Sequence, residues 1–479
     1  MKKQIQIIGI MLAVIALCSV ALLISRHDLG SNQGNKNAES ASPVLQEKIG
    51  AIQGLDVKNA AGGYQAKIEN GAITILGLEE DIPLDSAVLE DLISDITYIP
   101  IVQEVTEGKN RLAEFGLESP ACEVSIQKTD GTTMYLTVGN EVPGIDAAAS
   151  YIAYDDRVAV VYDTNLRAFR LGLADLISKE VTPAYQPDKN IWMIERAAVT
   201  ETTAVQPLII AEQDTSTVSG VVLNNYELES PIKYPADTKL TEKFLNTLFN
   251  IRAESVITIH PQEEQLVSLG LDAPFKTLEM QWLDEKKSEH LCRVFLSEED
   301  ANHEAYALRE GVPVVYRVNL SNAAWKNSTA EELMSRTILS PALVNLSWMT
   351  IRDSDGKEYT FSLDRTDEEK QEDYRVICGN VMIDRDSFRN FYYQIVDLTA
   401  DKVLLQNKPD PANMSQVLQI TWQMRESTEI NSVDFYKNDG ATAYAVRGNI
   451  EFELNFSQIM VLQETLHRLI AGEKIDARY

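Results

Sequence analysis

The sequence feature that most constrains the fold is a loop signature that occurs twice. In each copy an apolar residue, Gly, Leu, an acidic residue, a small residue and Pro stand between a helix-like and a strand-like segment. The separation from Gly116 to Gly270 is 154 positions, and the separation from Tyr162 to Tyr316 repeats it. Landmarks that keep one offset indicate a tandem repeat. The residues of the two loops are Gly116, Leu117, Pro120, Gly270, Leu271 and Pro274.

The glycine and the proline of this signature have distinct backbone roles. Glycine accepts a turn that a side chain would hinder, and proline ends a helix and can begin a strand. We therefore interpret the two loops as structural joints between a helix and a strand, and not as binding sites.

Strand and helix patterns divide most of the chain into three units of similar order. We place these units at residues 55–183, 184–344 and 345–479. Each unit is predicted to contain a hairpin, a helix, the joint, a second hairpin, a strand and a helix. The third unit has Lys408-Pro409-Asp410-Pro411 where the signature would stand, and such divergence is typical of the last unit in an array.

The predicted strands come in pairs, and the predicted helices are amphipathic. Turn dipeptides such as Asn70-Gly71 and Asp130-Gly131 separate neighbouring strands, which favours hairpins over strands that alternate with helices. The expected fold class is therefore α+β, with antiparallel sheets and packed helices. Apolar residues recur at helical spacing over residues 88–96, 166–177, 244–251, 388–398 and 459–470.

The N-terminus predicts a membrane anchor. Ile5 to Ser25 carry no charge over 21 positions, and a helix of that length is about 30 Å long, the thickness of a bilayer core. Two lysines precede this segment, so the N-terminus is expected in the cytoplasm and the bulk of the chain outside it. We predict a single-pass anchor at 1–29 and a flexible tether at 30–54. A cleaved signal peptide and a lipoprotein at Cys18 are the alternatives.

Charge and cysteine content exclude some classes of partner and site. The formal net charge of −29 repels the phosphates of nucleic acids, so no nucleic-acid partner is expected. The four cysteines are far apart in the sequence, which does not fit a disulfide framework and favours buried free thiols.

The residues that carry chemistry form no recognisable reaction centre. None of the five histidines stands at metal-site spacing from a second histidine or cysteine on a predicted helix. His290 and Cys292 would share one face of a strand, but one pair does not make a metal site. Asp353 to Gly356 begins like a calcium loop and lacks its later glutamate, so a turn is expected. The sequence predicts no catalytic residue, no cofactor, no metal site and no enzymatic activity.

The N-terminal anchor, the two loop signatures, the Asp130-Gly131 turn and the Val-Val-Tyr strand together resemble the bacterial domain-of-unknown-function family 4340. The resemblance covers most of residues 55–341 and, more loosely, 345–475. It implies an accessory role at the cell envelope, because members are often encoded beside ABC-transporter components of the gliding-motility type. The family carries no catalytic residues over to this chain.

These observations lead to one function hypothesis and two alternatives. We expect a non-enzymatic, membrane-anchored protein whose extracytoplasmic repeats bind a protein partner, an ABC-type permease complex at the envelope. An envelope hydrolase or polysaccharide-modifying enzyme would instead need two convergent carboxylates with raised pKa values. A structural spacer is the other alternative.

Overall fold

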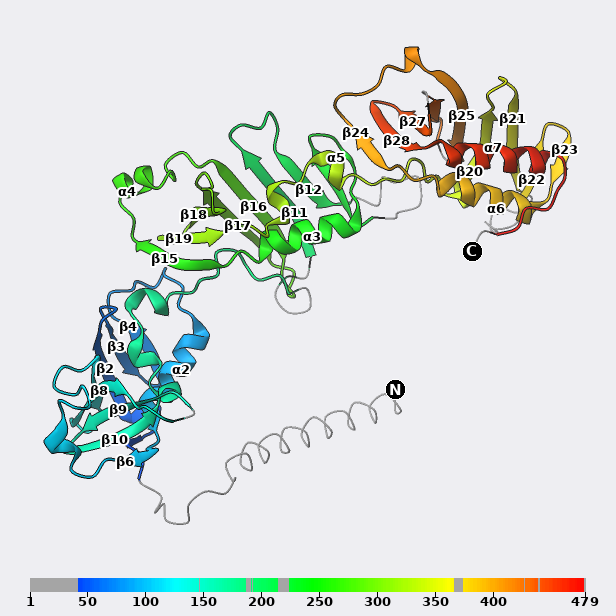
Figure 1. Cartoon of the computed structure of the whole chain (residues 1–479). Helices are drawn as coiled ribbons and strands as arrows, with labels where there is room; N and C mark the ends of the chain where they lie inside the picture. The colour runs from blue at the N-terminus through cyan, green and yellow to red at the C-terminus, as the bar shows by residue number, and fades with distance from the viewer. Residues whose placement is uncertain are drawn as a thin grey trace, which may run out of the picture. The chain divides into compact units, whose positions relative to one another are not determined.

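The computed structural model describes residues 42–145, 147–186, 191, 193–213, 224–365, 374–425, 427–437 and 440–477 (Figure 1). Contacts group the chain into two compact units, Met1–Leu78 with Ser86–Leu176, and Glu79–Asp85 with Ile177–Tyr479. The predicted anchor at Ile5 to Ser25 lies outside the described residues. Among those that are described, no helix is both long enough and apolar enough to cross a membrane. These two compact units are distinct from the three units predicted from the sequence, whose boundaries stay predictions.

The first unit is built on an eight-stranded antiparallel sheet. Its strand order is β4-β3-β2-β7-β8-β9-β10-β6. A small two-stranded sheet pairs β1 (Leu45–Gln46) with β5 (Tyr98–Ile99). The strands of the large sheet are β2 (Ile52–Asn59), β3 (Tyr64–Glu69), β4 (Ala72–Ile75), β6 (Gln103–Glu104), β7 (Cys122–Lys128), β8 (Thr133–Glu141), β9 (Ala149–Tyr154) and β10 (Arg157–Tyr162).

The second unit contains two nine-stranded antiparallel sheets. The first of them has the order β14-β13-β12-β11-β16-β17-β18-β19-β15. Its strands are β11 (Met193–Glu201), β12 (Leu208–Glu212), β13 (Tyr226–Ser230), β14 (Tyr234–Pro235), β15 (Ala253–Ile259), β16 (Lys276–Leu283), β17 (Glu289–Leu296), β18 (Glu304–Arg309) and β19 (Val314–Asn319).

The other nine-stranded sheet has the order β23-β22-β21-β20-β25-β26-β27-β28-β24. A carboxylate links the two sheets, since Glu331 of α5 (Ala330–Leu333) accepts hydrogen bonds from the backbone of Leu405 and Gln406 at 2.6 and 3.0 Å. The strands of this sheet are β20 (Leu346–Arg352), β21 (Glu358–Arg365), β22 (Tyr374–Cys378), β23 (Val381–Ile383), β24 (Lys402–Leu404), β25 (Ser415–Met424), β26 (Ile430–Lys437), β27 (Thr442–Arg447) and β28 (Ile450–Asn455).

The chain follows the same path through all three large sheets. The first strands run from the centre of the sheet to one edge, and a helix then carries the chain to the strand at the opposite edge. A loop returns the chain to the centre, where the next strand pairs with the first one. The helices at these equivalent places are α2 (Ser86–Thr97), α3 (Thr238–Phe249) and α6 (Arg385–Val396). The tandem repeat predicted from the loop signature is therefore present, with antiparallel sheets as expected.

One face of the central strands packs against the helices, as β21 and β16 show. In β21 the burial alternates, and the Phe361 ring lies 5.1 Å from Phe388 and 6.1 Å from Phe391 of α6, measured between centroids. In the second sheet Phe249 at the end of α3 meets Trp282 of β16 edge to face at 5.8 Å. Burying aromatic rings in this way removes a large apolar area from water.

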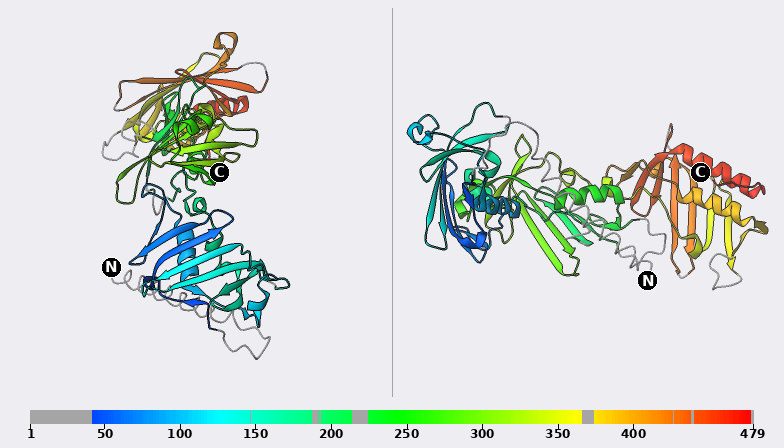
Figure 2. Two further views of the ribbon diagram at one scale, coloured as in Figure 1. Left: turned by 90° about the vertical axis from the view of Figure 1, so that its left-hand side faces the viewer. Right: turned by 90° about the horizontal axis from the view of Figure 1, so that it is seen from below.

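The helix at the end of the third sheet begins earlier than the sequence predicts. In the third sheet α7 (Phe456–Ile470) lies beside α6 across one face of the sheet (Figure 2). It begins before the predicted residue 459 because the Asn455 side chain caps it, accepting a hydrogen bond from Ser457 N–H at 2.9 Å.

The prediction of a helix over residues 166–177 is wrong. That segment contains two separate 3-10 turns, Ala168–Arg170 and Leu173–Leu176. Gly172 lies between them, and a Cβ at this position would come within 2.6 Å of the Ala61 carbonyl oxygen. Close packing of the backbone on the turn before β3 thus overrides the helical apolar spacing, because a continuous helix would need room for its side chains.

A buried carboxyl group holds the first of these turns. Asp95 of α2 is 3% exposed and accepts a hydrogen bond from Ala168 N–H at 2.9 Å. Burial raises the pKa of Asp95 to about 6, although the Ala168 N–H and the nearby Arg167 favour the charged form. The folded first unit therefore binds a proton at Asp95 over a pH range in which the unfolded chain does not.

Replacing Asp95 by Asn should remove a pH dependence of stability. Because the folded pKa lies above the ordinary 3.8, the Asp95 contribution is most favourable below pH 4 and is lost as the pH rises to about 6. Between pH 4 and 7 the free energy of unfolding of D95N should gain up to about 3 kcal/mol relative to the parent chain. Urea unfolding followed by circular dichroism measures this difference, and a difference that does not change with pH would contradict it.

Candidate functional site

The loop around Gly270 ends a helix with a backbone cap. Gly270 follows α4 (Glu263–Ser268) and has a φ of +68°. Leu271 N–H donates to the Leu266 carbonyl at 2.9 Å, and Gly270 N–H donates to the Val267 carbonyl at 3.1 Å. These two bonds define a Schellman cap, in which the residue after the helix adopts a left-handed conformation that glycine accepts most easily.

The loop around Gly116 makes the same bonds. Gly116 has a φ of +69°, Leu117 N–H donates to the Leu112 carbonyl at 2.9 Å, and Gly116 N–H donates to the Ala113 carbonyl at 3.3 Å. Phe115 and Leu117 are buried with Val158, and the Phe115 ring lies 4.5 Å from that of Tyr151. The loop thus packs on β9 and β10.

The remaining signature residues direct the chain into the central strands. Leu271 is buried, as Leu117 is, and anchors its loop. Pro120 and Pro274 stand two residues before β7 and β16 begin. The structure therefore brings each set of signature residues together as a turn between an edge strand and a central strand. Their role as joints is a prediction that substitution can test.

Gly270→Val should lower the melting temperature without selectively abolishing partner binding. A branched side chain in the left-handed region costs about 2 kcal/mol or more, whereas Asn tolerates it. G270N is therefore the matched control and should melt closer to the parent chain. Thermal unfolding and a binding assay together check this, and unchanged melting with lost binding would make the loop a binding site.

A second glycine is required where the first loop meets the sheet. A Cβ at Gly139 of β8 would lie 2.1 Å from the Phe115 carbonyl oxygen, while Asn140 N–H donates to that same oxygen at 2.8 Å. The equivalent residue in the second sheet is Ser297, whose Cβ would lie 3.6 Å from a Cβ built on Gly270. The first loop therefore approaches its sheet more closely than the second loop does.

Gly139→Ala should destabilise the first unit by roughly 2–3 kcal/mol, because a backbone carbonyl cannot move aside as a side chain can. Gly50→Ala is the matched control, since nothing lies within 4 Å of a Cβ at that position. The urea midpoints of unfolding of the two variants measure this difference. Equal midpoints would show that the loop moves enough to accommodate the added methyl group without loss of stability.

The sheet face opposite the helices carries exposed apolar residues at equivalent strands. Tyr135 of β8, Leu291 of β17 and Ile430 of β26 are 69%, 51% and 61% exposed. Each lies near the start of the second strand of a hairpin, in β7–β8, β16–β17 or β25–β26. Each side chain points away from the buried side of its strand. We call these three residues the open-face residues.

Ion pairs lie on the second sheet near Leu291. In the second sheet Arg293 contacts Glu279 at 2.9 Å and Glu310 at 3.0 Å, and Glu279 also contacts Arg196 at 3.1 Å. Half-exposed ion pairs of this kind contribute little to stability individually, but the alternating charges hold the side chains in one arrangement. The open face thus combines single apolar side chains with ordered charged neighbours.

A cavity of about 450 Å³ lies beside the second loop. Two lysines line it with their carboxylate partners, Lys276 with Glu201 at 2.8 Å and Lys326 with Glu299 at 2.9 Å. The lysine side chains are only 13% and 12% exposed. His303 also bonds to Glu299, at 2.6 Å. The cavity is therefore polar and nearly balanced in charge.

Two carboxylates of this cavity, Glu201 and Glu299, are held in their charged forms. A hydrogen bond from Lys276 lowers the pKa of Glu201. Burial would raise the pKa of Glu299, but bonds from Lys326 and His303 bring it below its ordinary value. A general acid in a glycoside hydrolase needs a raised pKa. These two groups can bind polar partners, and neither is poised to donate a proton.

The residues whose sequence pattern resembled a metal site make contacts within the protein. His290 stacks on Trp282 at 5.3 Å and bonds to Asp284 at 3.0 Å, while Cys292 is buried. Asp353 accepts hydrogen bonds from the backbone of its own turn.

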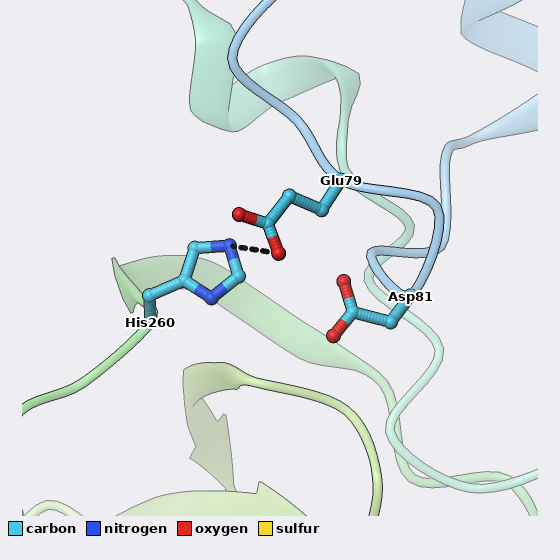
Figure 3. A group of neighbouring side chains, drawn as sticks. All are labelled: Glu79, Asp81 and His260. Carbon is cyan, nitrogen blue, oxygen red and sulfur yellow. Dashed lines mark ion pairs between the residues drawn. The ribbon is translucent and has the colours of Figure 1, made fainter.

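The structure brings together three possible metal ligands that the sequence did not indicate. They are Glu79, Asp81 and His260, and their ligand atoms all lie within 4.8 Å of one another (Figure 3). The two carboxylates precede α2, and the histidine follows β15, so their separation in sequence hides the cluster from spacing rules. The expectation of no metal site therefore meets a candidate cluster of three ligands.

One family model matches the chain. It is described as "Domain of unknown function (DUF4340)", and it matches residues 78–217 and 227–417. The matched segments begin just after β4 and within β13, which are equivalent strands of two sheets. The match confirms the family that the loop signatures resemble and its repetition. No curated protein and no solved structure matches the chain.

Proposed function

This chain belongs to the DUF4340 family, and on that premise we propose that it is a non-enzymatic, membrane-anchored protein that binds a protein partner outside the cytoplasm. The partner we propose is an ABC-type permease complex at the bacterial cell envelope. The observation that carries the proposal is the recurrence of exposed Tyr135, Leu291 and Ile430 at equivalent strands of three sheets. Large apolar side chains bind partners well where they enter pockets and lose water.

The geometry of the open face favours protein binding. Its apolar residues each pair with a residue of the preceding strand, Tyr135 with Ser125, Leu291 with Gln281 and Ile430 with Gln423, so little backbone freedom is lost on association. Charged neighbours such as Arg293 and Glu310 suit the polar rim of an interface.

The proposed compartment rests on the apolar segment Ile5 to Ser25 as a single-pass anchor and on residues 30–54 as a tether. Two of the free cysteines suit an oxidising environment, because Cys122 and Cys292 are buried. Burial raises the pKa of Cys122 to about 12 and also raises that of Cys292. Thiols in this state are poor nucleophiles and resist disulfide exchange.

Replacing the open-face residues should abolish partner recovery. Affinity capture of the full-length chain from solubilised membranes should recover ABC-type permease subunits, and Y135S/L291S/I430S should reduce their yield about tenfold or more. The matched control is V205S/Y393S/M460S, which changes three exposed apolar residues away from this face. Quantitative mass spectrometry of the captured proteins checks the expectation.

Two results would contradict the proposal. Recovery of the bait without permease subunits would remove the proposed partner. Equal loss of permease from both triple variants would remove the open face as the binding surface. Circular dichroism of each variant shows that the substituted chains are folded.

A further inference from the structure

The cluster of Glu79, Asp81 and His260 is held in place by its own backbone. Ile82 is 3% exposed, and its N–H bonds to the Glu79 carbonyl at 3.1 Å, so a tight turn directs both carboxylates to one side. His260 has a φ of +48°, and its N–H donates to the Pro313 carbonyl at 2.7 Å. The backbone of His260 is thereby fixed just after β15, and its imidazole faces the two carboxylates (Figure 3).

Further contacts connect the carboxylate loop to the neighbouring backbone of the same unit. Ser178 N–H donates to the Pro83 carbonyl at 2.8 Å, and Leu84 forms a β-bridge with Ile177. Arg252, one residue before β15, lies 3.6 Å from Asp85. The carboxylates and the histidine therefore meet because both segments are attached to one framework.

The polar atoms of the cluster have few partners. The Nε2 atom of His260 is itself buried and makes no hydrogen bond, and its nearest acidic atom, Glu79 Oε2, is 3.9 Å away. Among the ion pairs of the described residues, Asp81 has none, and Glu79 has only this long contact. Glu79 and Asp81 are exposed, so water solvates their carboxylates, whereas the buried His260 nitrogen lacks a hydrogen bond at a cost in free energy.

We propose that Glu79, Asp81 and His260 bind one divalent transition-metal ion. An imidazole nitrogen with two carboxylate oxygens is a ligand set that Zn²⁺ accepts in four-coordinate geometry, with water in the remaining position. The cation would be bound by the two carboxylate groups and would give the His260 nitrogen a partner. Because the ligands come from two segments of one unit, the ion binds the loop before α2 to the end of β15.

Zinc titration of the full chain tests the site. Isothermal titration calorimetry with ZnCl₂ should give one ion per chain at this site, and H260A should weaken that binding about tenfold or more. D81N should weaken it as well. The matched control is His467→Ala, because His467 faces a single carboxylate, Asp353, at 3.6 Å. H467A should bind zinc as the parent chain does.

Two further readouts separate metal ligation from a structural effect. Zinc should raise the melting temperature of the parent chain and of H467A but not that of H260A. Cobalt at the same site should give visible absorption bands that H260A and D81N lose. Absence of zinc binding by the parent chain, or binding that H260A and D81N leave unchanged, would overturn the proposal. Both results are independent of whether permease subunits are captured.

Discussion

Each large sheet depends on one antiparallel pairing at its centre. β2 pairs with β7, β11 with β16 and β20 with β25, and the paired strands are far apart in the sequence. Closing so long a loop costs conformational entropy that local contacts do not offset, although the cost rises only slowly with loop length. The helix that crosses one face and the capped loop that returns to the centre both lie between the paired strands. Their packing is what makes the central pairing favourable.

The signature around Gly116 and Gly270 could be predicted because its chemistry is local. A left-handed residue after a helix favours glycine, and a proline before a strand restricts the chain, so both leave marks in a short stretch of sequence. Alternating burial along β21 likewise has a period that the sequence displays. The strand pairs, the main helices and the repetition follow from patterns of this kind.

The remaining features depend on contacts between distant segments. The spacing of residues 166–177 is helical, but the close approach of Gly172 to Ala61 decides their structure. In the sequence Asp95 resembles any carboxylate of a helix, because its contact with Ala168 exists only in the folded chain. His260 and Glu79 belong to different segments, so no spacing rule links them. The open-face residues were also missed, because exposure of a strand residue depends on which face the helices cover.

The close contact between Gly139 and the Phe115 carbonyl means that the first two repeats do not tolerate the same residues at this position. The second repeat has Ser297 at this position, and its hydroxyl accepts a hydrogen bond from Tyr306 N–H at 2.9 Å. A glycine moved into the second repeat would lose that bond and still fit. A serine moved into the first repeat would meet the carbonyl oxygen. At this position the residue can therefore be exchanged between the repeats in one direction only.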